Sequence, residues 1–329
     1  MKVIHRALLP FLLFAAFPVH PQPQSGPLDG AREHFRAGRF DQAQDRLREV
    51  RRQGPDKAEA AYLLGRIALH RHREAKAADR LQEAVSLKEK EARYHYWLGR
   101  AYGERAKHTN IFQRAYYATQ TKKQFEKALE ADPGHLHARV ALVMYTLRAP
   151  GFLGGSRQEA EAQTREVARR SRIAGLRCRG LLLEQVGKPR RALALYRKAV
   201  EEAPESHRPH RWLAGLLREM DRHEEAFAVY ERRMGASSPD WAAYYEHART
   251  ALETGKNLER AEQALRTYLD HGSAPEYPAR SDARFLLGQV LKEQGRGQEA
   301  RAAFRRALRL APDHPQADEA REHVKASIL

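Results

Sequence analysis

The stretch that decides the fold is residues 58–91, AEAAYLLGRIALHRHREAKAADRLQEAVSLKEKE. It reads as two helices and a turn, with Leu64 and Gly65 on the first helix and Ala77 and Leu81 on the second. The same spacing of small and large apolar residues returns along most of the chain with a period of about 34 residues, which is typical of stacked helix pairs. None of these pairs can bury its apolar face alone. We therefore predict an all-helical solenoid.

The repeat can be laid over eight units. A final polar-faced helix, within residues 315–329, would cover the open apolar edge of the last unit, as terminal helices of solenoids do. Ala, Leu, Arg and Glu dominate the composition and all favour helices. The predicted units are 24–57, 58–91, 92–135, 136–172, 173–206, 207–240, 241–275 and 281–314.

Four units carry the pattern most clearly: LLGRIAL with AADRLQEA, WLGRAY with KQFEKALEADP, GLLLEQ with ALALYRKAVEEAP, and LLGQVL with ARAAFRRALRLAP. They resemble the tetratricopeptide repeat (TPR) family, in which small residues let the two helices approach and Pro ends the unit. The resemblance covers about residues 24–314. It implies a right-handed solenoid that binds other proteins.

Residues 1–24 have the layout of a secretory signal peptide. Lys2 and Arg6 precede an apolar run at 7–17, and a proline-rich polar stretch follows. The run is too short to span a bilayer comfortably, so we predict no transmembrane segment beyond this leader. We expect an exported bacterial protein of the periplasm or cell envelope. An uncleaved membrane anchor and a misassigned start are the alternatives.

The formal charge of +17 favours anionic partners. Acidic protein segments, nucleic acid and an anionic envelope surface all qualify, and a merely solvated Arg-rich surface is the simpler explanation. Catalytic motifs are lacking: despite 16 histidines there is no HExxH, no cysteine pair, no P-loop and no GxSxG. We predict no enzyme activity, no cofactor and no metal.

In the TPR family the second, fifth, ninth and twelfth positions of each first helix point into the concave groove. The resemblance implies a row of arginines beside a row of tyrosines, which suits an acidic peptide or chain terminus because arginine pairs carboxylates in a bidentate fork. A chance ladder is the alternative. The Lys/Asn set that clamps a carboxylate in chaperone-binding TPR proteins is not at these positions. The predicted groove residues are Arg32, Tyr62, Arg66, Tyr96, Arg100, Tyr245 and Arg249.

Two insertions, at 106–118 and 150–156, interrupt the third and fourth units. We expect the first to lengthen the second helix of its unit, with Thr109 or Asn110 as the N-cap. Either the second insertion folds over this helix and the two bury each other, or their apolar side chains dock a partner. The residues concerned are Phe112, Tyr116, Tyr117, Phe152 and Leu153.

These observations predict a non-catalytic exported scaffold for protein–protein interaction. The alternative function is a nucleic-acid-binding helical repeat protein that reads RNA, which the net charge supports. The signal-like N-terminus argues against RNA, and no pair of base-reading residues recurs through the units, so nucleic acid is the less favoured partner.

Overall fold

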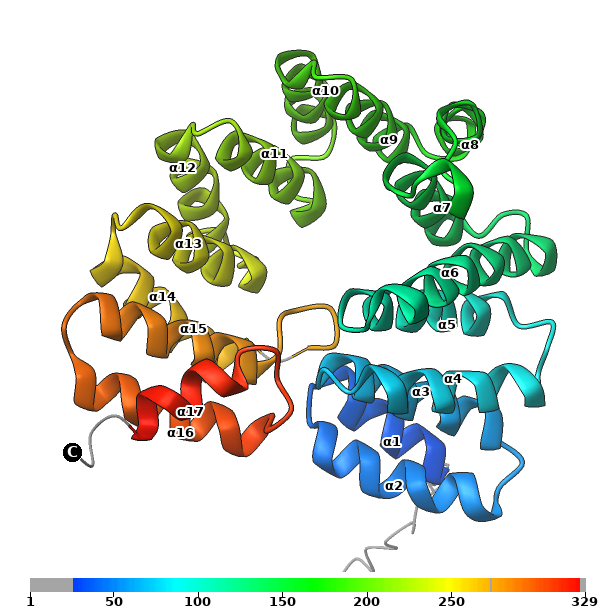
Figure 1. Ribbon diagram of the computed structural model, residues 1–329, viewed down its shortest axis with the longest axis horizontal. Helices are drawn as coiled ribbons and strands as arrows, with labels where there is room; N and C mark the ends of the chain where they lie inside the picture. The colour runs from blue at the N-terminus through cyan, green and yellow to red at the C-terminus, as the bar shows by residue number, and fades with distance from the viewer. Residues whose placement is uncertain (1–25, 273, 326–329) are drawn as a thin grey trace, which may run out of the picture.

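The computed structural model describes residues 26–272 and 274–325. The predicted signal peptide at 1–24 lies outside these residues. Within them the chain forms seventeen α-helices and one short 3-10 turn, η1 (Gly151–Leu153), and no strand. The helices pair antiparallel and stack side by side (Figure 1), which confirms the predicted all-α solenoid of about eight pairs.

The first four pairs run from the N-terminus to the middle of the chain. Their helices are α1 (Pro27–Arg36), α2 (Phe40–Gln53), α3 (Lys57–His70), α4 (Glu74–Leu87), α5 (Ala92–Lys107), α6 (Ile111–Ala131), α7 (Leu136–Arg148) and α8 (Arg157–Arg170). The remaining helices are α9 (Arg172–Gln185), α10 (Pro189–Glu202), α11 (His207–Glu219), α12 (His223–Met234), α13 (Trp241–Thr254), α14 (Leu258–His271), α15 (Arg280–Glu293), α16 (Gly297–Leu310) and α17 (Ala317–Lys325).

Close approach of the two helices in a pair depends on the small residue of the first helix. A Cβ added at Gly65 would lie 2.6 Å from Leu81 Cγ, and one added at Gly99 would lie 2.7 Å from Phe125 Cε1. Leu81 and Phe125 occupy the large apolar position of the second helix and are buried. The physical explanation of the repeat pattern therefore holds in both pairs.

The C-terminal helix closes the stack as predicted. Ala317 and Ala320 of α17 are buried against the last pair, and the His323 ring stacks on Phe304 of α16 at 5.5 Å. Among the described residues, no helix combines the length and the apolar character that crossing a membrane requires.

The first insertion lengthens α6 to 21 residues, where most second helices have 14. Asn110 caps it, because its side-chain oxygen accepts a hydrogen bond from Gln113 N at 3.1 Å. The second insertion does not cover the tip of this helix: Phe112 is 86% exposed and Phe152 is 85% exposed. The second insertion instead contacts α6 beyond the first insertion, where Lys122 Nζ donates to Gly154 O at 3.3 Å.

The row of pairs curves until the last pairs lie beside the first (Figure 1). The contact is made by side chains of the α3–α4 turn, of α15 and of the segment between α16 and α17. The inner wall of the curve consists of odd-numbered helices, since residues of α3, α5, α11, α13 and α15 face a common central cavity. This cavity is where a groove-binding ligand would sit.

Candidate functional site: the central cavity

The central cavity has a volume of about 810 Å³. Its walls come from repeats far apart in the sequence, and the segment 275–279 between α14 and α15 closes one side. The side chains that give it its chemistry are Arg66, Tyr96, Trp97, Arg100, His137 and Arg208.

An alternating column of aromatic rings and guanidinium groups crosses the first three repeats. Arg66 lies 4.7 Å from the ring of Phe35 and 4.2 Å from that of Trp97, and Arg100 lies 4.3 Å from the Trp97 ring. Cation–π contacts of this kind fix a guanidinium in place while leaving the N–H groups at its edge available. Arg66 Nε is buried and has no hydrogen-bond partner among the described residues.

A second cationic group faces the column from the middle of the chain. Arg208 of α11 donates a hydrogen bond to Nε2 of His137, on α7, at 3.2 Å. Burial lowers the pKa of His137, and the charges of Arg208, His135 and Arg100 lower it further. These groups therefore share one region of positive potential.

This positive potential is not neutralised internally. Within the ranges 26–272 and 274–325, no carboxylate forms an ion pair with Arg66, Arg100 or Arg208. Three acidic residues of the cavity, Asp282, Glu74 and Glu104, lie around His72 and raise its pKa. Glu246 and Glu276 also line the cavity. The cavity thus has a cationic wall and an acidic corner, and an anionic group would be attracted to the cationic wall.

Three predicted groove residues line the cavity: Arg66, Tyr96 and Arg100. Others are already engaged. Arg32 is paired with Asp29 and Glu59 at 3.4 and 3.5 Å.

Further groove residues are also unavailable. Arg249 pairs with Glu246 and Glu253. Tyr62 is only 5% exposed, and Tyr245 is partly buried beside Tyr268. We leave these side chains, with Arg32, out of the binding surface, because a ligand could reach them only by displacing an internal partner or opening the core.

Sequence reasoning missed Trp97, His137 and Arg208. The last two stand at the second position of α7 and α11, a position that the family directs into the groove, so the signal was present in the repeat frame. Trp97 was missed because its role depends on two arginines, one of them in the preceding repeat.

The insertion residues separate into exposed and buried ones. Phe112, Tyr116 and Phe152 are exposed. Tyr117 is buried, stacked on Tyr102 at 5.9 Å and contacted by the Arg105 guanidinium at 4.4 Å, so it belongs to the interior. Leu153 is half-buried, and its carbonyl accepts a hydrogen bond from Tyr145 Oη at 2.7 Å.

Two histidines and a carboxylate meet where the curve closes, a set that could hold a metal ion. His72 Nε2 lies 2.7 Å, and His314 Nε2 3.1 Å, from the same Oδ1 of Asp282. However, His314 Nδ1 accepts a hydrogen bond from the backbone N–H of Gln316 at 3.1 Å, so the ring hydrogen is on Nε2. A metal ligand needs a lone pair at that atom. We therefore describe the three residues as a hydrogen-bonded clasp.

Comparison with known proteins identifies the repeats. The tetratricopeptide repeat family matches residues 28–90, 179–239 and 245–315, more than half of the chain. Comparison with curated proteins gives no match.

Among solved structures, yeast Tom70 has a TM-score of 0.64 at 15% identity, covering 97% of this chain and 66% of that one. A thermophilic TPR protein of Thermus thermophilus has a TM-score of 0.49 at 21% identity and covers 58% and 97%. One from Parabacteroides merdae has 0.43 at 13% and covers 92% and 98%. The likeness to Tom70 shows the fold alone, and the sequence match carries the assignment: this chain belongs to the tetratricopeptide repeat family.

Proposed function

We propose that the protein is a non-catalytic scaffold that binds an acidic segment of a partner protein in its central cavity. The observation that carries this proposal is the set of three arginines, Arg66, Arg100 and Arg208, that face the cavity with no carboxylate partner among the described residues. TPR domains generally bind proteins, which supports a protein ligand. The three arginines favour a protein segment that carries acidic residues.

Binding would use groups that are already held in position. Stacking on Trp97 restricts Arg66 and Arg100, so little side-chain entropy is lost when a carboxylate binds. Arg208 would bind a second acidic residue of the same segment. Charge-assisted hydrogen bonds to arginine are about twice as strong as neutral ones, so an extended segment with spaced acidic residues fits best.

The site is expected to act outside the cytoplasm. The basic start, short apolar run and proline-rich end of residues 1–24 support an exported bacterial protein that works in the periplasm or at the envelope. Fractionation of cells and N-terminal sequencing of the mature chain test this part independently of the cavity.

The cavity is tested with fluorescent peptides. An acidic peptide with spaced glutamates should bind the mature chain, and a lysine peptide of equal length should not. Arg100→Glu with Arg208→Glu should abolish binding of the acidic peptide. The matched control, Arg305→Glu with Arg306→Glu on the exposed face of α16, should bind as the wild type does.

Equal loss in both variants would show that only overall charge matters and would reject the proposal. Single-stranded RNA is the competing ligand. If RNA binds better than the acidic peptide, with a steep fall of the association constant with salt, the RNA function replaces the scaffold function.

A further inference from the structure

A second cationic pocket lies between α2 and α4, the second helices of the first two pairs. Its volume is about 190 Å³, and it shares no lining residue with the central cavity. Leu64 and Ala68 are its apolar floor, and none of the described carboxylates lines it. Seven cationic side chains line it: Arg48, Arg51, Arg52, Arg71, Arg73, Lys76 and Arg80.

Carboxylates around this pocket compensate only part of the charge. The ion pairs join Arg71 to Asp41, Arg48 to Asp45, and both Arg51 and Arg80 to Glu83. Asp41 and Asp45 are highly exposed, so water screens their charge. In the described parts of the chain, Arg52, Arg73 and Lys76 form no ion pair.

Two further observations concern the cationic groups of this pocket. Partial burial lowers the pKa of Lys76, and the charges of Arg73, Arg48, Arg80 and Arg71 add to that lowering. Arg51 Nε is buried without a hydrogen-bond partner among the described residues. An ammonium group surrounded by arginines is destabilised unless an anion joins them.

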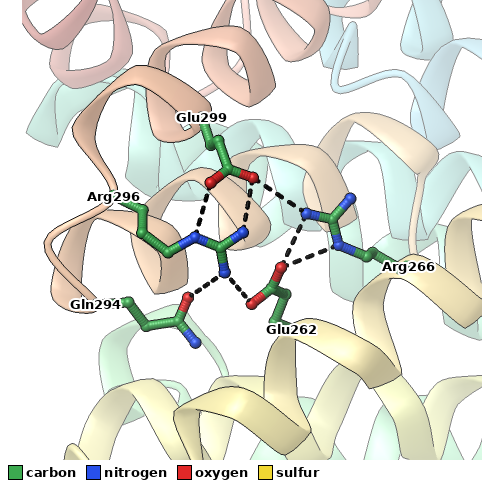
Figure 2. A network of polar contacts seen from close by, with 5 residues as sticks. All are labelled: Glu262, Arg266, Gln294, Arg296 and Glu299. Atoms are coloured by element: carbon green, nitrogen blue, oxygen red, sulfur yellow. Dashed lines mark hydrogen bonds and ion pairs between the residues drawn. The ribbon is translucent and has the colours of Figure 1, made fainter.

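In the last two pairs, carboxylates neutralise the arginines at the equivalent junction between second helices. Between α14 and α16, Arg296, Glu262, Arg266 and Glu299 form an alternating network (Figure 2). Arg296 Nε donates to Glu299 Oε1 at 2.8 Å, and Arg266 Nη2 donates to Glu262 Oε1 at 2.8 Å. Each guanidinium lies between two carboxylates, and the charges balance.

The repeat places the two junctions in register. The small residues Ala43 of α2 and Ala261 of α14 correspond, as do Ala77 of α4 and Ala300 of α16, and all four are buried. When positions are counted from these alanines, the junction between α2 and α4 has the same two arginines as the junction between α14 and α16, but it lacks the two glutamates. Arg48 stands for Arg266 and Arg73 for Arg296, whereas Gln44 stands for Glu262 and Lys76 for Glu299.

An intermediate junction supports this comparison. At the N-terminus of α12, Arg222 Nε donates to Glu225 Oε1 at 2.6 Å, and Arg197 of α10 donates to the same carboxylate at 3.3 Å. Arg222 and Glu225 occupy the positions of Arg296 and Glu299. In these two junctions, therefore, the arginines hold a carboxylate at the position that Lys76 takes between α2 and α4.

We propose that the pocket between α2 and α4 binds a compact phosphate-type oxyanion. Its oxygens would lie where the carboxylates of Glu262 and Glu299 lie in the other junction. Arginine forks match the oxygens of a phosphoryl group, and seven cations with three rim carboxylates leave room for a multiply charged ligand such as pyrophosphate. The phosphoryl group can belong to a free anion or to a lipid headgroup.

The test restores the missing carboxylates. Pyrophosphate is titrated calorimetrically into the mature wild type and into Gln44→Glu with Lys76→Glu, at one ionic strength held with sodium chloride. We expect binding by the wild type and none by the double variant, which should also melt at a higher temperature without ligand. A flotation arm uses phosphatidylcholine vesicles with and without phosphatidic acid, and variant-sensitive binding in this arm alone identifies a headgroup.

The matched control makes the same charge change elsewhere. Gln185→Glu with Lys188→Glu alters two exposed residues at the turn between α9 and α10 and should leave binding unchanged. Circular dichroism verifies the helical fold, and Lys76→Gln replaces the double variant if that fold is lost. No binding in either arm, equal binding by wild type and variant, or equal loss in the control overturns the proposal. The acidic-peptide experiment on the central cavity is unaffected by any of these outcomes.

Discussion

His72 Nε2 lies 2.7 Å from Oδ1 of Asp282, although 210 residues separate the two in the sequence. His72 occupies the turn between α3 and α4 and has a positive φ of 51°, and Asp282 lies in the first turn of α15, where it also accepts from Ala279 N at 3.1 Å. With His314 on the same oxygen, this contact joins the second and eighth pairs. It turns an open solenoid into a closed curve around the central cavity.

The clasp should depend on pH. Burial opposes a charge on His72, but the hydrogen bond and charge of Asp282, with Glu74 and Glu104, outweigh burial and raise its pKa. The carboxyl of Asp282 is buried too, and both histidines hold its pKa well below the usual value. A raised histidine pKa stabilises the contact below the free value of about 6.5 and loses that contribution as pH rises through the raised value.

The carboxyl of Asp282 contributes to stability with the opposite pH dependence. A lowered carboxyl pKa stabilises the contact above the free value of about 3.9 and fails only as pH falls through the lowered value. Closure should therefore be tightest between about pH 4 and 6.5 and loosen above neutrality. Spin labels on exposed Glu49→Cys of α2 and Arg305→Cys of α16, in a Cys178→Ala background, would report the distance distribution by pulsed EPR. A distribution that stays constant from about pH 5 to 9 contradicts this expectation.

Removing the clasp should open the curve. We expect His72→Ala to broaden the label-to-label distribution, to increase the radius of gyration in X-ray scattering, and to cost about 1–3 kcal/mol because Asp282 loses a buried partner. His108→Ala, at an exposed residue after α5, is the matched control and should change neither. If both variants scatter like the wild type, packing alone holds the ends together.

The close helix approach predicts different outcomes for two helical glycines. Gly65→Ala should destabilise the fold by about 1–3 kcal/mol, because the new methyl would meet Leu81 Cγ at 2.6 Å. Gly215→Ala on α11 has nothing within 4 Å of the new Cβ and should stabilise by up to about 1 kcal/mol through helix propensity. Urea unfolding of both variants measures the difference, and equal midpoints would mean that Leu81 moves aside freely.

Contacts between residues close in the sequence could be predicted, whereas contacts between distant repeats could not. The Gly65–Leu81 contact and the Asn110 cap involve residues close in the chain, so spacing alone indicated them. The clasp could not be predicted, because the meeting of His72 with Asp282 depends on the summed curvature of the intervening pairs. The sequence also did not indicate which groove arginines form internal ion pairs. Arg32 and Arg66 stand at equivalent positions of successive repeats, yet Arg32 pairs with Glu59 whereas Arg66 packs on Trp97.

The projecting end of α6 should contribute little to stability. Phe112 and Phe152 leave most of their surface in water, so Phe112→Ser with Phe152→Ser should change the free energy of unfolding by no more than about 0.5 kcal/mol. Tyr117→Ala, further along the same helix, should cost about 3–5 kcal/mol, because it removes a buried ring that contacts Tyr102 and Arg105. Thermal unfolding compares the two, and a large loss in the serine variant would show that these exposed rings pack together in solution.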